Sequence, residues 1–209
     1  MTKMTFDRAV RDLAAIGARF YGRGWVLGTS GNFSVRVSSR PLRLVITASG
    51  VHKRALTRSD FLAIDATGCV VGRAARKPSA ETRLHLEIVN ARGAGAVLHT
   101  HSVWGTILSD LHAGRHGLAI QDFEMLKGLD GVSTHEHREW IPIVENDQDM
   151  ERLAGVVRDL LAREPQAHAF LLRGHGLYTW GPDVATAERH VEILEFLLEA
   201  IGRRTGSWQ

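Results

Sequence analysis

One apolar run that ends in two histidines constrains this chain more than any other feature. Segment 96–102 has the sequence Ala-Val-Leu-His-Thr-His-Ser. Residues two apart on a β-strand point to the same face, so this predicted strand projects His99 and His101 together. A second apolar run, 169–172, leads into a turn in which glycines flank His175. Because both predicted strands end next to histidines, we expect the three imidazoles to meet at one edge of a sheet.

Three neutral imidazoles around an open coordination position are the ligand set of a catalytic metal ion. The predicted ligands are His99, His101 and His175. Imidazole binds zinc, iron and other divalent ions, so these residue types leave the metal open. Histidine is also a common surface or core residue. We interpret the remaining histidines in that ordinary way: His52, His85, His112, His116, His135, His137, His168 and His190.

The length and charge of the chain narrow the classes of function. At 209 residues it is long enough for a single domain, 1–209, with a proper core. The net charge is +3 and the cations are scattered, which argues against nucleic acid and suits a small anionic substrate. No apolar stretch approaches the ~20 residues of a membrane span. A single cysteine, Cys69, excludes an internal disulfide, and we expect a cytoplasmic protein.

Apolar periodicity predicts about five helices and about eight short strands, mixed along the chain. The predicted helices are 5–20, 82–91, one that starts at Ser102, 146–163 and 184–201. The predicted strands are 33–37, 42–47, 61–65, 69–72, 96–102, 118–123, 140–144 and 169–172. This mixture predicts an α/β protein, a layered α/β/α domain with a central, largely antiparallel sheet.

Several single residues are given local roles by the same patterns. Thr5, Ser79 and Asn146 are predicted to cap helices, and Gly202 to end the last helix before a mobile tail, 203–209. Pro142 cannot donate to a strand ladder, so its strand is predicted at an edge of the sheet. Cys69 is predicted to be a small buried residue in a hairpin.

The stretch 28–34, Gly-Thr-Ser-Gly-Asn-Phe-Ser, offers backbone N–H groups and side-chain donors to an anion. A polar hairpin turn is the alternative interpretation. Two carboxylates also stand near predicted element ends. Glu81 lies in the first turn of a helix, where it favours the helix dipole. Glu124 follows an apolar strand, and its pKa should rise if it is partly buried, although a solvated loop carboxylate is the alternative.

Five of these stretches occur in one order across nearly the whole chain. They are 28–34, 46–50, 77–82, 99–102 and 174–176. Together they resemble the class II aldolase and adducin-like family. That resemblance implies a divalent metal on the three histidines, usually Zn²⁺, and a homotetramer with active sites near subunit interfaces. It also implies a phosphate site built from Ser30, Gly31, Asn32, Ser49, Gly50 and Ser79. The family often has two serines where this chain has Ser79-Ala80.

Three further stretches, 121–128, 146–149 and 171–181, are most similar to a branch of that family that removes water from a phosphorylated ketose. This resemblance implies a zinc-dependent lyase with Glu124 as the acid or base. Glu81 matches the acid/base carboxylate of the family's aldolases and is the second candidate, and it can also ligate the metal.

Other functions remain open at this point. The metal histidines cannot separate a dehydratase from a fuculose-phosphate-type aldolase or a ribulose-phosphate 4-epimerase. A non-enzymatic, adducin-like interaction module is a further alternative. A cupin-like oxygenase also uses a His-x-His pattern, but that fold is nearly all β and the predicted helices argue against it.

Overall fold

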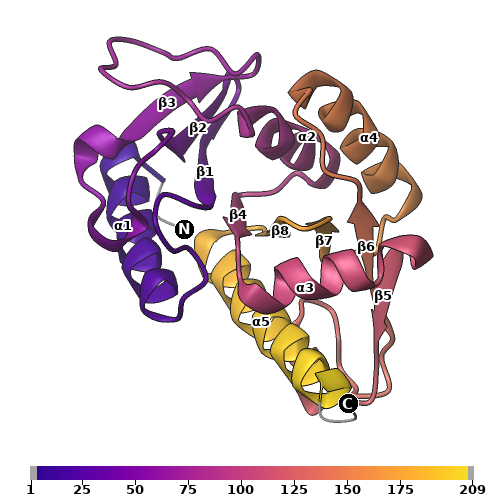
Figure 1. Cartoon of the computed structure of the whole chain (residues 1–209). Helices are drawn as coiled ribbons and strands as arrows, with labels where there is room; N and C mark the ends of the chain where they lie inside the picture. The colour runs from indigo at the N-terminus through magenta and orange to yellow at the C-terminus, as the bar shows by residue number, and fades with distance from the viewer. Residues whose placement is uncertain (1–3, 207–209) are drawn as a thin grey trace.

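A single eight-stranded sheet forms the middle of the molecule (Figure 1). The computed structural model describes residues 4–206. The strands are β1 Asn32–Ser39, β2 Leu42–Thr47, β3 Phe61–Asp65, β4 Ala96–Thr100, β5 Gly117–Ile120, β6 Glu139–Val144, β7 Ala169–Leu172 and β8 Gly176–Gly181. Their order is β3-β2-β1-β4-β8-β7-β6-β5, and every neighbouring pair is antiparallel except β6 and β7.

Helices cover both faces of this sheet. They are α1 Phe6–Gly22, α2 Thr82–Arg92, α3 Val103–Leu111, α4 Met150–Arg163 and α5 Val184–Gly206. Alternation along β2 sends Leu44 and Ile46 toward α2 and α4, and Val45 toward α1. Helices α3 and α5 pack on the same side as α1 (Figure 1). The predicted layered α/β/α fold with a largely antiparallel sheet is therefore confirmed.

The first helix begins and packs as its sequence predicts. The Thr5 hydroxyl accepts a hydrogen bond from the Arg8 N–H at 3.3 Å, which caps the helix. Leu13, Ile16 and Phe20 recur along one face and are buried against the sheet. In the described part of the chain, no helix is long and apolar enough to cross a bilayer.

Strand β4 lies at the centre of the sheet, between β1 and β8, and fixes the position of its histidines. His99 stands opposite Asn32 on one side and Tyr178 on the other. The turn before β8 approaches β4 closely at Gly176. A Cβ atom there would lie 1.9 Å from the Thr100 carbonyl oxygen. Only glycine therefore allows this turn to reach the end of β4.

The predicted caps of α2 and α4 are wrong. Helix α2 has Glu81 at its N-cap position, without a side-chain cap, and the Ser79 hydroxyl accepts the Glu81 N–H at 3.3 Å. Helix α4 is capped by Asp149, whose carboxylate accepts from Glu151 and Arg152 at 3.1 Å, and not by Asn146. Each cap lies later than predicted, because residues 80–81 form a turn before α2 and residues 145–149 are irregular before α4.

Helix α5 continues past Gly202, contrary to the prediction. A Cβ at Gly202 would lie 1.9 Å from Trp104 Cε3, so this glycine allows α3 and α5 to pack closely and does not end a helix. Residues 203–206, predicted to belong to a mobile tail, are part of α5. Residues 207–209 of that tail, which include Trp208, lie outside the described residues.

Two further details of the strands differ from the predictions. Cys69 is exposed, and the predicted second arm of its hairpin makes only an isolated bridge, between Ile64 and Val70. Strand β6 is not at an edge, because β5 pairs with it. Pro142 is tolerated there because β7 is in register only with Ile143 and Val144.

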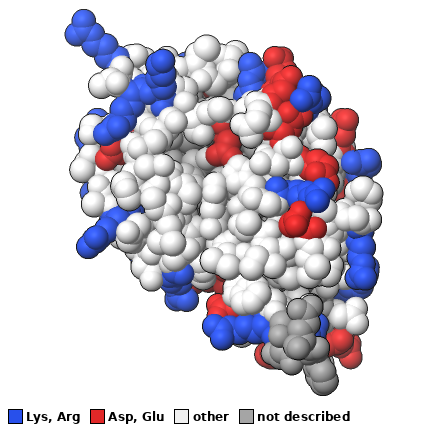
Figure 2. All heavy atoms as spheres, viewed as in Figure 1, with Lys and Arg blue, Asp and Glu red and all other residues white. Residues whose placement is uncertain are grey.

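On the face shown in Figure 2, positive and negative side chains are interspersed around a largely uncharged middle. The described residues on this face form no continuous basic surface of the kind that nucleic acid requires.

Candidate functional site

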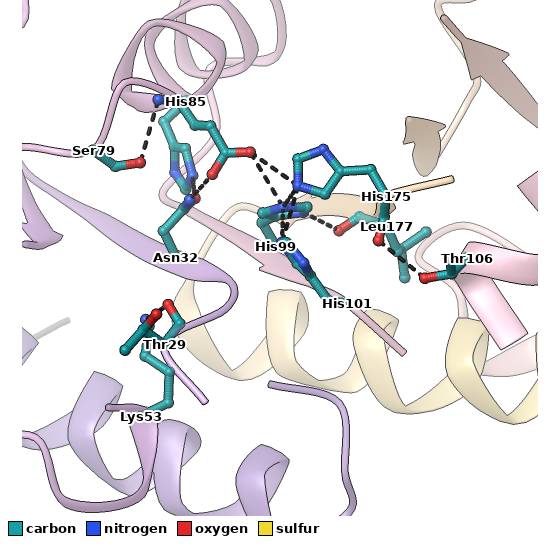
Figure 3. Close-up of polar contacts among 11 residues, drawn as sticks. Thr29, Asn32, Lys53, Ser79, His85, His99, His101, Thr106, His175 and Leu177 are labelled. Carbon is teal, nitrogen blue, oxygen red and sulfur yellow. Dashed lines mark hydrogen bonds and ion pairs between the residues drawn. The ribbon is translucent and has the colours of Figure 1, made fainter. Parts of the chain in front are cut away.

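The three predicted histidines point their Nε2 atoms toward one another (Figure 3). The Nε2 atom of His101 lies 2.8 Å from that of His99 and 3.0 Å from that of His175. The His99 and His175 Nε2 atoms are 3.3 Å apart. Nitrogen atoms this close, each with a lone pair to offer, are the arrangement from which a metal ion is coordinated.

Hydrogen bonds hold the ring of His99 and the backbone of His101 and His175 in place. The Nδ1 atom of His99, which is fully buried, lies 2.9 Å from the Leu177 carbonyl oxygen. Donation to that carbonyl leaves Nε2 unprotonated and directed at the other rings. The His101 N–H donates to the Trp25 carbonyl at 2.7 Å. The His175 carbonyl accepts from the Thr106 hydroxyl at 3.1 Å.

Electrostatics favour neutral rings, which is the form that binds metal. Burial, together with repulsion from neighbouring rings, lowers the pKa of His101 to about 3. Burial and the neighbouring His99 likewise lower the pKa of His175 to about 4. These rings are therefore unprotonated at neutral pH, and the donor set of three imidazoles fits a divalent cation.

Glu81 completes this cluster from the start of α2. Its Oε1 atom lies 3.5 Å from His99 Nε2 and 3.3 Å from His175 Nε2. Burial alone would raise the pKa of Glu81, but the neighbouring His99 and His175 hold it well below its ordinary value. An ionised carboxylate in this position can serve as a fourth ligand or as a base.

Three buried polar residues, Asn32, His85 and Ser34, form a hydrogen-bonded chain that ends on Glu81. Asn32 Nδ2 donates to Glu81 Oε2, and Asn32 Oδ1 accepts from His85 Nε2. The His85 Nδ1 atom lies 2.8 Å from the Ser34 hydroxyl. From the sequence, His85 is interpreted as an ordinary residue, so its place in this chain is missed. The signal that could have identified it is its spacing, because residues four apart share one face of a helix, as Glu81 and His85 do.

The residues predicted to bind phosphate line one cavity of about 260 Å³ beside the histidines. They are Ser30, Gly31, Asn32, Ser49, Gly50 and Ser79, together with Thr29, Ala48, Glu81 and His101. Gly31 has φ +72°, and a Cβ there would lie 2.6 Å from the His99 carbonyl oxygen. This glycine therefore allows the loop to fold directly over the histidine strand. Two larger surface hollows, of about 730 and 630 Å³, contain none of the cluster residues.

Glu124 is the one predicted site residue that lies neither in this cavity nor in the cluster of Glu81 and the three histidines. It begins the short 3₁₀ helix Glu124–Gly128, its side chain is 71% exposed, and it forms an ion pair with Lys127. The hydrogen bond from Lys127 lowers the pKa of Glu124, so the expected rise in pKa does not occur within one chain. One chain alone therefore does not bring Glu124 to the histidines.

A second group of histidines, also interpreted as ordinary, lies at the opposite ends of the strands. His137 Nε2 lies 2.8 Å from Glu139 Oε2, and His168 Nδ1 lies 3.0 Å from the same oxygen. Burial would lower the pKa of His168, but Glu139 outweighs it and raises the pKa. Through these contacts Glu139 links the starts of β6 and β7, and none of the three residues lines the cavity.

The sequence is similar to known proteins over nearly its whole length. Residues 11–201 match the model of the class II aldolase and adducin N-terminal domain. A methylthioribulose-1-phosphate dehydratase of Pseudomonas syringae pv. tomato is 44% identical over 197 residues, which cover 94% of this chain and 95% of the relative. The enzyme of the same name from Methylococcus capsulatus is 44% identical over 202 residues, 96% of each chain.

Solved structures agree with the fold. YgbL of Klebsiella pneumoniae, described as an aldolase, epimerase or decarboxylase, has a TM-score of 0.79 at 25% identity, over 96% of this chain and 91% of that one. The L-fuculose-1-phosphate aldolase of Thermus thermophilus has a TM-score of 0.74 at 25% identity, over 98% of this chain and 100% of that one.

Proposed function

This chain belongs to the class II aldolase and adducin family, and from that premise we propose that it is a lyase that dehydrates 5-methylthioribulose 1-phosphate to 5-methylthio-2,3-dioxopentyl phosphate, a step of methionine salvage. The 44% identity with dehydratases over nearly the whole chain supports this choice within the family. The observation that carries the proposal is the convergence of three Nε2 atoms, 2.8 to 3.3 Å apart, beside a cavity of polar and glycine residues.

His99, His101 and His175 would hold one Zn²⁺ per chain in this proposal. The argument is chemical: three imidazoles whose Nε2 atoms converge are a donor set that zinc prefers, although iron or manganese can use the same atoms. A divalent cation held there would supply Lewis-acid stabilisation of negative charge on the substrate's oxygen atoms.

The elimination of water needs one proton removed and one proton delivered, and a tautomerisation then completes the reaction. Loss of the C3 proton gives an enediolate, and protonation of the C4 hydroxyl lets it leave as water, which breaks the C4–O bond. The resulting enol takes up a proton at C4 and loses the proton of its C3 hydroxyl, which gives the 2,3-diketone. We assign the proton transfers to Glu124, with Glu81 as the second candidate because it is ionised and adjacent to the histidines.

The exposed position of Glu124 adds a condition to this assignment. Glu124 lies outside the cavity of its own chain, so it can act only if it reaches the cavity of a neighbouring chain in an oligomer. The expected homotetramer, with sites near its subunit interfaces, would satisfy that condition. The proposed setting is the cytoplasm, where a phosphorylated metabolite is available.

The substrate phosphate would bind among Ser30, Gly31, Asn32, Ser49, Gly50 and Ser79. These residues offer hydroxyl groups, an amide and the N–H groups of tight turns, which suit an anion. Binding a group remote from the reacting carbons would position those carbons over the histidines and contribute to catalysis.

An aldolase is the second candidate, because Glu81 and the three histidines lie together as an aldolase would require. The likeness to the Thermus L-fuculose-1-phosphate aldolase is one observation in its favour. An epimerase would use the same ligand set. A purely adducin-like interaction module would have no need for buried, mutually oriented imidazoles.

Incubation of the metal-loaded protein with separate sugar phosphates tests the proposal. We expect diketone from 5-methylthioribulose 1-phosphate, and no aldehyde from fuculose 1-phosphate or epimer from ribulose 5-phosphate. Aldehyde or epimer without diketone would replace the dehydratase with one of its relatives. Metal-loaded protein that turns over none of the three would contradict the proposal.

A further inference from the structure

Lys53 is a fully buried lysine in the segment that follows the second phosphate-binding turn. Its side chain is 1% exposed. The ammonium group donates to the Val51 carbonyl at 2.9 Å and to the Thr29 carbonyl at 3.2 Å. Among the residues that the structure describes, no carboxylate lies within ion-pair distance of it. Two of the three N–H groups of the ammonium therefore donate to neutral carbonyls, and no negative charge among the described residues lies next to its positive charge.

Such a charge is costly to bury. Burial lowers the pKa of Lys53 to about 8, and the carboxylates of Glu81 and Asp60 oppose this lowering from a longer range. The ammonium group is therefore largely charged at neutral pH. A buried cation that the protein itself does not neutralise is typical of a site whose ligand is an anion.

The two carbonyl groups identify where that anion would lie. Thr29 belongs to the first turn that lines the cavity, and Val51 directly follows Ser49 and Gly50 of the second turn. In Figure 3 the Lys53 side chain reaches toward Thr29. The ammonium group thus ties together the two turns that would bind phosphate.

The cavity wall has no positive charge of its own. Its described lining residues include no lysine or arginine. A phosphate held there by hydroxyl and N–H groups alone would bring a full negative charge, or two, into a partly enclosed space. Lys53 is the cation that the fold holds directly behind these groups.

We propose that Lys53 is the counter-charge for the substrate phosphate and the positioning residue that holds the two phosphate-binding turns together. The inference rests on the proposed function only for the identity of the sugar. Recognition of the phosphate group is independent of the reaction that follows. Lys53 acts through the turns, so its loss should weaken binding of phosphorylated molecules more than it slows chemistry.

Titration of the metal-loaded protein with inorganic phosphate tests this role. Lys53→Met removes the charge and its hydrogen bonds, while Lys53→Gln keeps an N–H donor and removes only the charge. The matched control is Arg54→Met, which removes an exposed cation from the adjacent residue. We expect both Lys53 variants to weaken phosphate binding at least about tenfold, the loss typical of a charge-assisted interaction. The control should remain within about twofold of wild type.

Equal phosphate affinity in wild type and Lys53→Gln would overturn the counter-charge role. If Lys53→Met does not fold, as judged by circular dichroism and metal content, Lys53→Gln decides the question. Steady-state kinetics provide the second readout: KM for 5-methylthioribulose 1-phosphate should rise about tenfold or more, while kcat changes less. A fall in kcat with unchanged KM would also overturn the proposal. Absence of turnover in wild type would contradict the proposed function, and the phosphate titration would still test Lys53.

Discussion

The imidazole of His99 lies flat against the phenol ring of Tyr178, with ring centroids 3.8 Å apart and planes 12° from parallel. Tyr178 in turn stacks on Phe170 at 5.0 Å, so the histidine rests on the aromatic part of the core. With its Nδ1 held by the Leu177 carbonyl, the ring can neither rotate nor tilt freely. His99 is therefore oriented before any ligand binds.

This stacking predicts a specific dependence of metal affinity on Tyr178. Tyr178→Leu removes the flat surface and should weaken metal binding roughly 10- to 100-fold, as loss of groups that orient ligands does. Tyr178→Phe keeps the ring and should bind metal within a few-fold of wild type. Competition with a chelating dye measures both affinities. Equal affinities in the Leu and Phe variants would show that stacking does not orient His99.

Removal of one of the three imidazoles should abolish the site. His175→Ala takes away one of three nitrogen ligands, and we expect loss of bound metal and of turnover. His135→Ala is the matched control for metal content, because His135 is exposed and does not belong to the cluster. Elemental analysis of both purified variants gives the result. Full metal content in His175→Ala would contradict the ligand assignment.

The two carboxylates should behave differently when neutralised. Glu124→Gln should keep its metal but slow turnover by ~10²-fold or more, the usual scale for a general acid or base. Glu81→Gln should also weaken metal retention, because Glu81 Oε1 lies 3.3 Å from His175 Nε2. Metal content and kcat are measured side by side. Near-normal turnover in Glu124→Gln would move the acid/base role to Glu81.

If Glu124 acts across subunits, two inactive variants should complement each other. A mixed oligomer of Glu124→Gln and His175→Ala contains some sites with an intact carboxylate from one chain and intact histidines from the other. Random mixing of equal amounts should restore about a quarter of wild-type turnover. Each variant refolded alone is the control. No recovery in mixed oligomers of confirmed composition would mean that Glu124 does not serve a neighbouring chain.

The sequence predicted those parts of the site that depend on local geometry. His99 and His101 share a strand face by periodicity, and glycines around residues 28–31 and 174–176 mark the turns. Features that depend on packing were missed. The chain from Asn32 to His85 and the burial of Lys53 arise only when β1, α2 and the 48–53 segment meet in space. No local pattern separates these residues from ordinary polar ones.

The missed details of the fold have the same origin. Gly202 has the sequence of a helix end, but contact with Trp104 explains it instead. Pro142 is typical of an edge strand, yet β5 pairs beyond it, because the partner of each strand is decided by the whole sheet. Tertiary packing overrode local propensity at both positions.

Glu195 on α5 provides a pH-dependent prediction. The side chain is 2% exposed, and its Oε1 atom accepts a hydrogen bond from the Thr100 hydroxyl, next to the histidine pair. Burial raises the pKa of Glu195 from its ordinary value of 4.5 to about 7. The folded protein thus binds this proton more tightly than the unfolded chain. The stabilisation is fully present below pH 4.5 and is lost as the pH rises through 7.

Glu195→Gln should remove this pH dependence, because glutamine keeps a similar shape and cannot ionise. Between pH 5 and pH 8, wild type should lose roughly 2–3 kcal/mol of stability relative to Glu195→Gln. Urea unfolding of both proteins at one protein concentration measures the difference, so that oligomer dissociation affects both alike. Glu192→Gln, a substitution at a partly exposed position of the same helix, is the control and should follow wild type. Parallel pH profiles for wild type and Glu195→Gln would show that Glu195 is ionised in the folded protein throughout this range.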